Sequence, residues 1–288
     1  MSSWDVAEPL SAESVAPFGT YPPNHLQSIV REVGQRLPSN KVGKRVSAWL
    51  RSLLRATSPH PIDVTVLGQR MRLRLLDNAC ERRLMVTPHY FDASELAILR
   101  SRMRPDFHFV DIGANVGTYS VFVGTSAGPE ARIIAIEPQT ALQVRLNENL
   151  ALNGLSNVHV APCAVSDHEG IIEFVIDPKN VGFTSLHTTR KGRGERIIQR
   201  MPVRRLLDIV REAGFQRIDA IKIDIEGAED LALLPFFEHA PQSLWPSTIV
   251  IEDNSHEWKR DCIGFLRERG YEVIWARGAR ENVVLSRD

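Results

Sequence analysis

Two glycines lie close together in the segment DIGANVG, which runs from Asp111 to Gly117 and follows a run of apolar residues. Gly113 and Gly117 carry no side chain, so backbone N–H groups of this turn and the start of a following helix can approach an anionic group. An acid, Asp111, stands directly before the turn. The pattern predicts a loop that binds the charged end of a ligand.

The spacing of these glycines separates two kinds of ligand. The pattern is DxGxxxG, whereas dinucleotide-binding enzymes use GxGxxG, and Thr118 or a later residue stands in place of the third glycine. A nicotinamide- or flavin-dependent oxidoreductase is therefore the less favoured alternative.

Acidic residues also follow the next two apolar runs. Glu137 comes about 20 residues after the glycine turn, where a carboxylate can accept hydrogen bonds from both hydroxyls of a ribose. Ser166 and Asp167 follow the third run, and a carboxylate there can accept from the amino group of adenine. An adenosyl ligand fits both positions. The alternatives are a solvated strand-end acid at Glu137 and a turn or helix cap at Ser166 and Asp167.

Three charged residues alternate in the segment KIDIEG. Alternation with period two places Lys222, Asp224 and Glu226 on one face at the end of a strand. Charged groups beside a buried strand are costly unless they are paired or used, so we predict either a catalytic group or a structural lysine–carboxylate pair. A further strand end is expected to direct more polar side chains into the same crevice, namely Glu252, Asp253 and His256.

Short apolar runs alternate with helical stretches from about Asp106 to the end of the chain. This alternation predicts an α/β fold with a doubly wound, mainly parallel sheet and helices on both faces. Ligands of such sheets bind at the carboxyl ends of the strands, where the polar residues above are found. The runs are FHFVDIG, ARIIAIEP, NVHVAPCAV, DAIKIDIEG, STIVIED, YEVIWA and NVVLS.

The N-terminal third has a different pattern. Residues 1–24 contain four prolines and are predicted to form a poorly ordered arm. Residues 25–100 are predicted to form an extension with two basic amphipathic helices, followed by a β-hairpin over residues 62–76 around Gly68. The basic face is either a solvated helical cap or a contact for an anionic membrane or substrate. The extension could shape an acceptor pocket or a homo-oligomer interface.

Composition excludes several classes of protein. The 288 residues include 35 Lys plus Arg and 35 Asp plus Glu, so there is no overall field to attract nucleic acid. Three separated cysteines argue against a disulfide scaffold or a zinc knuckle. The chain shows no secretory pattern and no apolar run long enough to cross a membrane, and we expect a cytoplasmic protein.

From about Asp106 to Glu252 the chain resembles the FkbM family of methyltransferases that use S-adenosylmethionine (SAM). The segment TPHYFDASELAIL also resembles the family's approach to the first strand. The resemblance implies a Rossmann-like class I methyltransferase domain over residues 101–288. It also implies methylation of a hydroxyl on a small molecule, a sugar or a polyketide-like natural product. The matching motifs are FVDIGANVGTYS, IIAIEP, NLALN leading into GLSNVHV, AVSDHEG, TSL and IKIDIEGAE.

The resemblance also implies a role for each matching residue. Glu137 would hold the ribose of SAM, and Asp167, beside Ser166, would hold its adenine. Asp224 and Glu226 would lie beside the sulfonium and the acceptor. The methionine part of SAM would be held by Asp111, Gly113, Asn115 and Gly117.

Methyl transfer requires alignment of donor and acceptor and removal of the hydroxyl proton. Asp224 is the first candidate for this base, and His256 and His187 are alternatives because histidine titrates near neutral pH. Asp224 with Glu252 or Asp253 could instead hold Mg²⁺. The segment TSLH, which ends at His187, is either a lid over the substrate or an ordinary surface loop. A protein that binds SAM without turnover is the remaining alternative.

Overall fold

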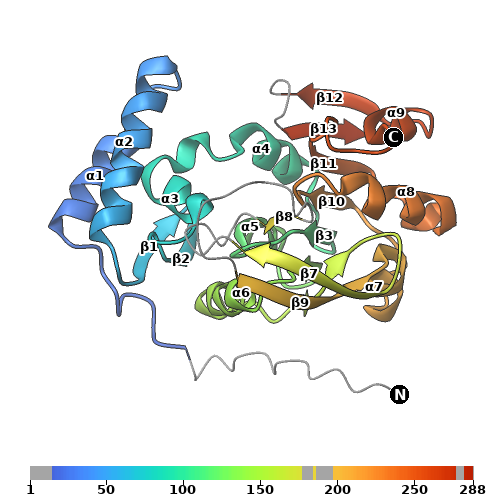
Figure 1. Cartoon of the computed structure of the whole chain (residues 1–288), viewed down its shortest axis with the longest axis horizontal. Coiled ribbons are helices and arrows are strands. Elements are labelled where there is room, and N and C mark those ends of the chain that lie inside the picture. Colours follow the sequence, from blue (N-terminus) through green and yellow to red (C-terminus); the bar gives the residue numbers. More distant parts are fainter. Residues whose placement is uncertain (1–14, 177–183, 186–196, 277–281, 288) are drawn as a thin grey trace.

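The computed structural model describes residues 15–176, 184–185, 197–276 and 282–287. Its largest element is a seven-stranded sheet with the order β12-β13-β11-β10-β3-β4-β5 (Figure 1). The strands from β11 to β5 pair in parallel, and β13 is antiparallel to both of its neighbours. The predicted mainly parallel sheet is confirmed. The strands are β3 (His108–Ile112), β4 (Arg132–Ile136), β5 (Val158–Ala161), β10 (Ala220–Ile223), β11 (Thr248–Glu252), β12 (Glu272–Ala276) and β13 (Asn282–Ser286).

Helices cover both faces of this sheet, which explains why its central strands are continuous apolar runs. Along β3, Phe109 packs into one core, while Val110 and Ile112 pack into the core on the opposite face. The first core includes side chains from α4 (Ala93–Arg102), α5 (Thr118–Ala127) and α6 (Thr140–Leu152). The second includes side chains from α7 (Leu206–Glu212), α8 (Glu229–His239) and α9 (Cys262–Arg267). Short 3-10 helices lie at η2 (Pro88–Tyr90) and η3 (Gln242–Leu244).

A second sheet has four strands in the order β6-β9-β7-β8. The segment NVHVAPCAV, expected to be one strand, contributes to both sheets, because β5 ends at Ala161 and the next strand begins at Ala164. Pro162 lies between them and has no N–H group to continue the ladder. The strands of this sheet are β6 (Ala164–Val165), β7 (Gly170–Ile176), β8 (Thr184–Ser185) and β9 (Ile197–Arg204).

The N-terminal extension contains the predicted helices and hairpin. The two-residue turn of the hairpin, Leu67 and Gly68, has φ of 52° and 85°, the positive values that a tight turn between twisted strands requires. Figure 1 shows the extension at one side of the molecule, away from β12 and β13. Its elements are α1 (His25–Gln35), α2 (Lys41–Thr57), β1 (Ile62–Val66), β2 (Gln69–Leu73) and α3 (Ala79–Val86).

Residues 15–24 do not form the poorly ordered arm that was predicted for them. The N–H groups of Gly19 and Tyr21 donate to Asp63 Oδ2 at 2.9 and 3.2 Å. Asp63 is buried and forms an ion pair with Arg72 at 2.8 Å. The segment is held on the hairpin because its backbone amides help to satisfy a buried carboxylate. Residues 1–14 lie outside the described residues.

Two asparagines of the NLALN motif attach the hairpin to α6. Asn149 accepts from Arg72 N at 2.8 Å and donates to Val116 O in the glycine turn at 2.9 Å. Asn153 accepts from Arg70 N at 3.0 Å and donates to Arg70 O at 2.7 Å. The side chains of Asn149 and Asn153 thus hydrogen-bond to the backbone at the free edge of β2. These bonds join the extension to α6 of the sheet domain.

Within the described part of the chain, no helix has the length and apolarity needed to span a lipid bilayer.

Candidate active site

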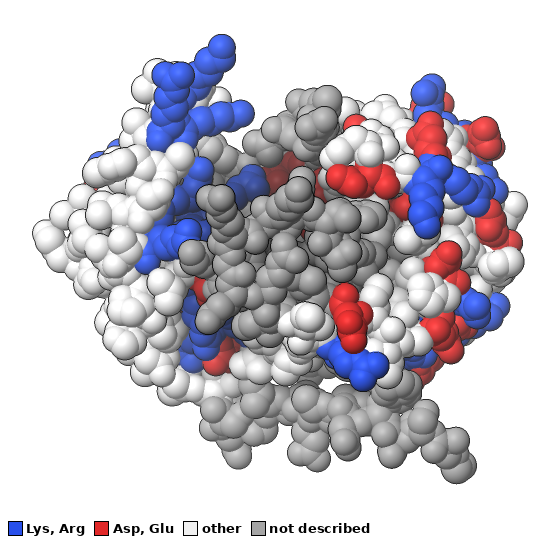
Figure 2. All heavy atoms as spheres, in the orientation of Figure 1, with Lys and Arg blue, Asp and Glu red and all other residues white. Residues whose placement is uncertain are grey.

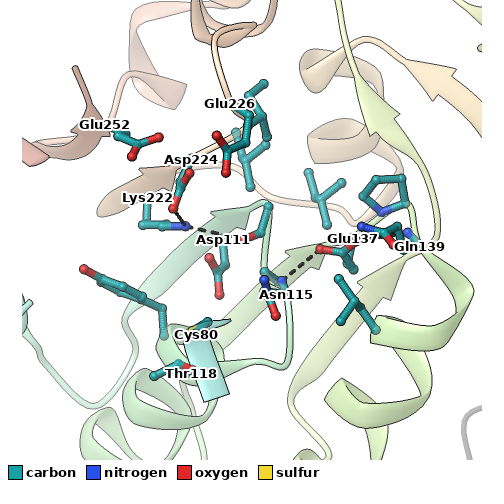
Figure 3. A pocket seen from close by; sticks show the side chains of 18 of the residues that line it. Cys80, Asp111, Asn115, Thr118, Glu137, Gln139, Lys222, Asp224, Glu226 and Glu252 are labelled. Atoms are coloured by element: carbon teal, nitrogen blue, oxygen red, sulfur yellow. Dashed lines mark hydrogen bonds and ion pairs between the residues drawn. The ribbon is translucent and has the colours of Figure 1, made fainter. Parts of the chain in front are cut away.

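A cavity of about 520 Å³ opens at the carboxyl ends of β3, β4, β10 and β11. The residues after these strands and part of the N-terminal extension form its walls. Figure 3 shows Asp111 and Asn115 between Glu137 on one side and Lys222 with Asp224 on the other. The polar residues that line it include Asn78, Arg83, Asp92, Asp111, Asn115, Thr118, Glu137, Lys222, Asp224, Glu226 and Glu252.

The glycine turn packs closely on the neighbouring chain. Gly113 has φ of 76°, and a Cβ at this position would lie 2.1 Å from Asp224 O. Gly117 has φ of 86° and leaves room for Leu146, whose Cδ1 would be 2.4 Å from a Cβ. Gly113 lines the cavity, whereas Gly117 is not among the described lining residues. Gly113 therefore lets the ends of β3 and β10 approach each other, and Gly117 lets the turn approach α6.

Asp111 is buried at the base of the cavity. Its Oδ2 accepts from Ser120 N at 3.1 Å and from Ser120 Oγ at 2.7 Å. Its Oδ1 is buried and has no hydrogen-bond partner within the described part of the protein. Burial raises the pKa of this carboxyl, and the positive charge of Lys222 opposes that rise. The site thus holds one acceptor atom that needs a donor.

Glu137 is held by the backbone of two loops. Its Oε1 accepts from Gln139 N and its Oε2 from Asn115 N, each at 2.9 Å. Burial raises the pKa of Glu137 to about 7, although both backbone donors lower it. Each oxygen can accept a second hydrogen bond, so the carboxylate can still bind two hydroxyl groups of a ligand.

Lys222 forms the lysine–carboxylate pair that the sequence left open. Its Nζ lies 3.4 Å from Asp224 Oδ2 and 3.4 Å from Gly113 O. Burial disfavours the ammonium, but Asp224 and Asp111 raise the pKa of Lys222 above its ordinary value. The side chain of Asp224 is still 40% exposed and lines the cavity. Asp224 therefore pairs with Lys222 and can still contact a ligand in the cavity.

Asp224 is also hydrogen-bonded to Glu252, which ends β11. Burial and the charge of Asp224 raise the pKa of Glu252 to about 8. Burial opposes the charge on Asp224, but Lys222 and the hydrogen bond from Glu252 hold its pKa below the usual value. The two shifts have opposite signs, so the pair favours holding one proton between its two carboxyl groups.

Glu229, the last acid of the motif KIDIEGAE, organises the loop that follows β10. It is fully buried and holds Asn254, whose Nδ2 also donates to Glu252 Oε2 at 2.6 Å. Sequence analysis missed this residue, although its place in the motif was the available signal. Its donors are Ile225 N at 3.1 Å, Gly227 N at 3.2 Å, Asn254 Nδ2 at 3.2 Å and Trp258 Nε1 at 2.6 Å.

The sequence model described as "Methyltransferase FkbM domain" matches residues 111–273, which include every strand end around the cavity. The chain belongs to the FkbM methyltransferase family. A methyltransferase of Sordaria araneosa, sdnD, is 31% identical over 194 residues, which are 57% of this chain and 73% of that protein. The AMB antimetabolite synthetase AmbE of Pseudomonas aeruginosa is 27% identical over 208 residues, which are 59% of this chain and 10% of that protein.

Among solved structures, the methyltransferase FkbM of Methylobacillus flagellatus is similar to this chain. The match covers 85% of this chain and 59% of that protein. The TM-score is 0.40 and the sequence identity is 15%. The O-methyltransferase TomG of Streptomyces achromogenes is also similar. That match covers 67% of this chain and 78% of TomG, with a TM-score of 0.40 and 14% sequence identity.

Ser166 and Asp167 lie outside the main cavity of this FkbM methyltransferase. They line a separate cavity of about 350 Å³ that also borders α7 and α8. Asp167 Oδ1 lies 2.7 Å from His168 Nδ1 and 3.2 Å from Ser166 Oγ. The main cavity is instead lined by the preceding residues, Cys163 to Val165. The contact of Ser166 and Asp167 with adenine stays a prediction.

Asp253 and His256 do not face the crevice as expected. Neither residue is among the described residues that line the cavity. Asp253 Oδ1 accepts from Ser255 N at 3.1 Å, and His256 Nε2 lies 3.5 Å from Glu257 Oε1 near the surface. The chain turns directly after β11, where Asn254 N donates to Glu252 O at 3.0 Å. His187 lies outside the described residues.

The Mg²⁺ hypothesis for this FkbM protein finds no support. Among residues 15–176, 184–185, 197–276 and 282–287, no group of three or more His, Cys, Asp or Glu side chains could hold a metal ion. Asp224 faces the cation Lys222, and Asp253 is not among the described residues that line the cavity. The charge of Asp224 is therefore balanced by the protein itself.

The N-terminal extension, which was predicted to shape an acceptor pocket or an oligomer interface, supplies part of the wall of the FkbM site through residues that the sequence did not single out. Asn78 is fully buried and donates from Nδ2 to Asn115 Oδ1 at 2.9 Å. Asp92 Oδ2 accepts from the hydroxyl of Tyr119 at 3.0 Å. Asp92 lies in the segment TPHYFDASELAIL, and the resemblance of that segment to the family could have pointed to this wall of the cavity. The cavity is complete only where the extension contacts the sheet domain.

Proposed function

We propose that this FkbM methyltransferase transfers a methyl group from SAM to a hydroxyl oxygen of a small molecule or sugar. The observation that carries the proposal is the pair Asp111 and Glu137 at adjacent strand ends. Asp111 offers an unpartnered buried acceptor, and Glu137 can accept from two hydroxyls on the far side of the same loop. An amino acid joined to an adenosine carries donors that match both carboxyl groups.

The residues assign the parts of the donor as follows. Asp111 Oδ1 accepts from the ammonium of the methionine part, and the loop from Gly113 to Asn115 faces its carboxylate. Glu137 binds the two ribose hydroxyls. Cys163 and Val165 supply an apolar wall for the adenine beyond the ribose. Asn115 connects these contacts, because its N–H group fixes Glu137 and its side chain is held by Asn78.

Asp224 and Glu252 are proposed to act on the acceptor. SAM supplies a methyl group that a positively charged sulfur already activates. The acceptor oxygen forms the new bond to carbon while the carbon–sulfur bond breaks, and its proton passes to the Asp224–Glu252 pair. A single carboxylate is a weak base for a hydroxyl, whereas a pair that releases its remaining proton near pH 8 is better matched. Glu226 lines the same part of the cavity and is proposed to orient the acceptor.

Titration calorimetry with S-adenosylhomocysteine tests the donor site. We expect micromolar binding by the intact protein, and a loss on the order of tenfold or more for Glu137→Ala and for Asp111→Asn, since each removes hydrogen bonds to a charged group. Glu272→Ala, an exposed acid on β12, is the matched control and should bind normally. Failure of the intact protein to bind would refute the donor assignment.

A screen of hydroxylated small molecules and sugars, read by formation of S-adenosylhomocysteine and of a methylated product, tests the transfer itself. Product from a hydroxyl acceptor supports the proposal. Binding of S-adenosylhomocysteine without any product across the panel would favour a non-catalytic protein instead, and binding of NADH in its place would favour an oxidoreductase.

A further inference from the structure

The helices α1 and α2 concentrate positive charge in a chain whose overall charge is balanced. Residues 25–57 contain seven Lys or Arg residues and one acid, Glu32, whereas the whole chain has 35 of each sign. Glu32 is already paired with Arg36 at 2.7 Å. Figure 2 shows Lys and Arg gathered over these helices, while both signs are mixed over the C-terminal half. The extension therefore carries a local positive field.

Large apolar side chains are exposed within this field. On α2, Val42 is 66% exposed and Trp49 is 64% exposed. The buried row of the same helix includes Leu50 and Leu54, so the two exposed side chains are not part of the core contact of α2. α1 adds three partly exposed apolar side chains at helical spacing, Leu26, Ile29 and Val33.

Basic residues surround the exposed apolar ones. Lys41, Lys44 and Arg45 are all exposed and lie within one turn of Val42 or Trp49 on α2. Long cationic side chains can reach the headgroup region while their alkyl parts lie beside apolar neighbours. Tryptophan is enriched at the boundary between lipid and water. This combination on one helix is typical of a surface that lies on a membrane.

We propose that the outer face of α1 and α2 docks on an anionic lipid bilayer, with Val42 and Trp49 entering the interface and Lys41, Lys44 and Arg45 contacting lipid phosphates. Charge selects this partner over a second copy of the chain. A two-fold contact between copies through this face would bring the exposed cations Lys41, Lys44 and Arg45 of each copy close together, which is unfavourable without acids to pair them. The inference goes beyond the proposed methyl transfer and does not depend on it.

Co-sedimentation of the full chain with vesicles tests the proposal without donor or acceptor. We expect binding to vesicles of phosphatidylcholine with phosphatidylglycerol, weaker binding as salt rises, and no binding to phosphatidylcholine alone. The triple variant K41Q/K44Q/R45Q should lose on the order of 100-fold in affinity, given the usual attraction of each basic residue to an anionic surface. Trp49→Ser with Val42→Ser should also bind weakly.

Two control variants match these changes elsewhere on the surface. R211Q/K259Q/R267Q removes the same charge from exposed positions outside the extension. Ile171→Ser with Ile198→Ser removes two side chains that are each 63% exposed on β7 and β9. Both controls should bind anionic vesicles like the intact protein. Unchanged thermal unfolding of every variant establishes that the comparison concerns binding.

Three outcomes would overturn the proposal. The intact protein could fail to sediment with anionic vesicles. The serine double variant could bind them normally while soluble polyglutamate competes, which would point to an acidic protein partner. Sedimentation equilibrium could show a dimer that the serine double variant abolishes, which would identify a second copy as the occupant of this face.

Discussion

Asp224 and Glu252 are two carboxyl groups joined by a hydrogen bond, and Lys222 lies 3.4 Å from the oxygen of Asp224. Two such groups release their protons in two steps that belong to the pair. Lys222 lowers the pKa of Asp224, whereas burial and Asp224 raise the pKa of Glu252 to about 8, so the pair retains its second proton to about that pH. The pair thus becomes doubly charged, and a stronger base, only above that pH.

This titration predicts the pH dependence of turnover. The rate should rise with pH through about 8 and level off above it, because the fully ionised pair is the form that accepts the proton. Glu252→Gln should abolish the rise and lower kcat by roughly 10²- to 10⁴-fold, the usual contribution of a general base. The pH profile of kcat, measured with saturating donor and acceptor, checks both effects.

Glu226→Gln is the control for that experiment. It should retain the rise, shifted to somewhat lower pH, because Glu226 does not carry the shared proton but its charge helps to raise the pKa of Glu252. A profile of Glu252→Gln that still rises near pH 8 would mean that another group is the base.

Gly113 illustrates how one residue serves both packing and binding. Gly113→Ala would place a Cβ 2.1 Å from Asp224 O at a φ of 76°, whereas Gly154→Ala meets nothing within 4 Å at a φ of 67°. The control therefore carries the strain of a positive φ alone, about 1–2 kcal/mol. We expect Gly113→Ala to lower the free energy of unfolding by roughly 1–3 kcal/mol more, the usual effect of overpacking. Equal losses in urea unfolding would contradict the close approach.

At the scale of elements, the donor loop after β3 is supported from outside the sheet domain. Asn115 has φ of 53°, which is uncommon for a residue with a side chain, and its N–H group donates to Glu137. The N-cap of α3, Asn78, holds its side chain at 2.9 Å. The start of a helix in the extension thus positions the acid that we assign to the ribose.

Asn78→Ala should therefore weaken donor binding. The change leaves Asn115 Oδ1 without this partner and frees the loop that fixes Glu137, so we expect S-adenosylhomocysteine to bind on the order of tenfold more weakly. Asn157→Ala is the matched control, because Asn157 donates to Gly128 O and Ala131 O at the opposite end of the strands. Calorimetry should show normal affinity for the control. Normal affinity of Asn78→Ala would exclude the positioning role.

Element prediction succeeded where side chains are buried on both faces. The runs that became β3, β4, β10 and β11 are nearly all apolar, and a helix could not use such short runs as an amphipathic face. The prediction of a single strand over NVHVAPCAV was wrong. The apolar pattern continues across Pro162, but the hydrogen bonding between strands is interrupted there. Ser166 and Asp167 consequently follow β6 of the four-stranded sheet and not β5 of the seven-stranded one.

At the scale of the whole molecule, the extension and the sheet domain share one core. Leu54 and Ile62 pack in the same cluster as Phe109 and Ile133. A buried ion pair reinforces this contact, because Arg145 on α6 lies 2.6 Å from Glu81 Oε2, a fully buried carboxylate of α3. We therefore expect the two parts to unfold together.

Arg145→Met tests this coupling. It leaves the buried carboxylate of Glu81 unpaired, and the expected loss is about 3–5 kcal/mol in the free energy of unfolding. Glu148→Gln, which removes the more exposed pair of Glu148 with Arg74, should cost about 1 kcal/mol or less. Urea unfolding should remain a single transition for tryptophan fluorescence and for circular dichroism. Two separate transitions in the intact protein would show that the extension folds alone.

The type of sheet and the family could be predicted from short segments of the sequence. These features are local, because apolar runs, glycine spacing and strand-end acids are each encoded within a few residues. Only the tertiary structure decided which of the polar residues meet. Asn78 reaches Asn115 across 37 positions, and Glu252 reaches Asp224 because β10 and β11 pair in parallel. Beyond a strand end, the direction of a side chain depends on loop backbone such as the positive φ of Glu226, which no spacing in the sequence specifies.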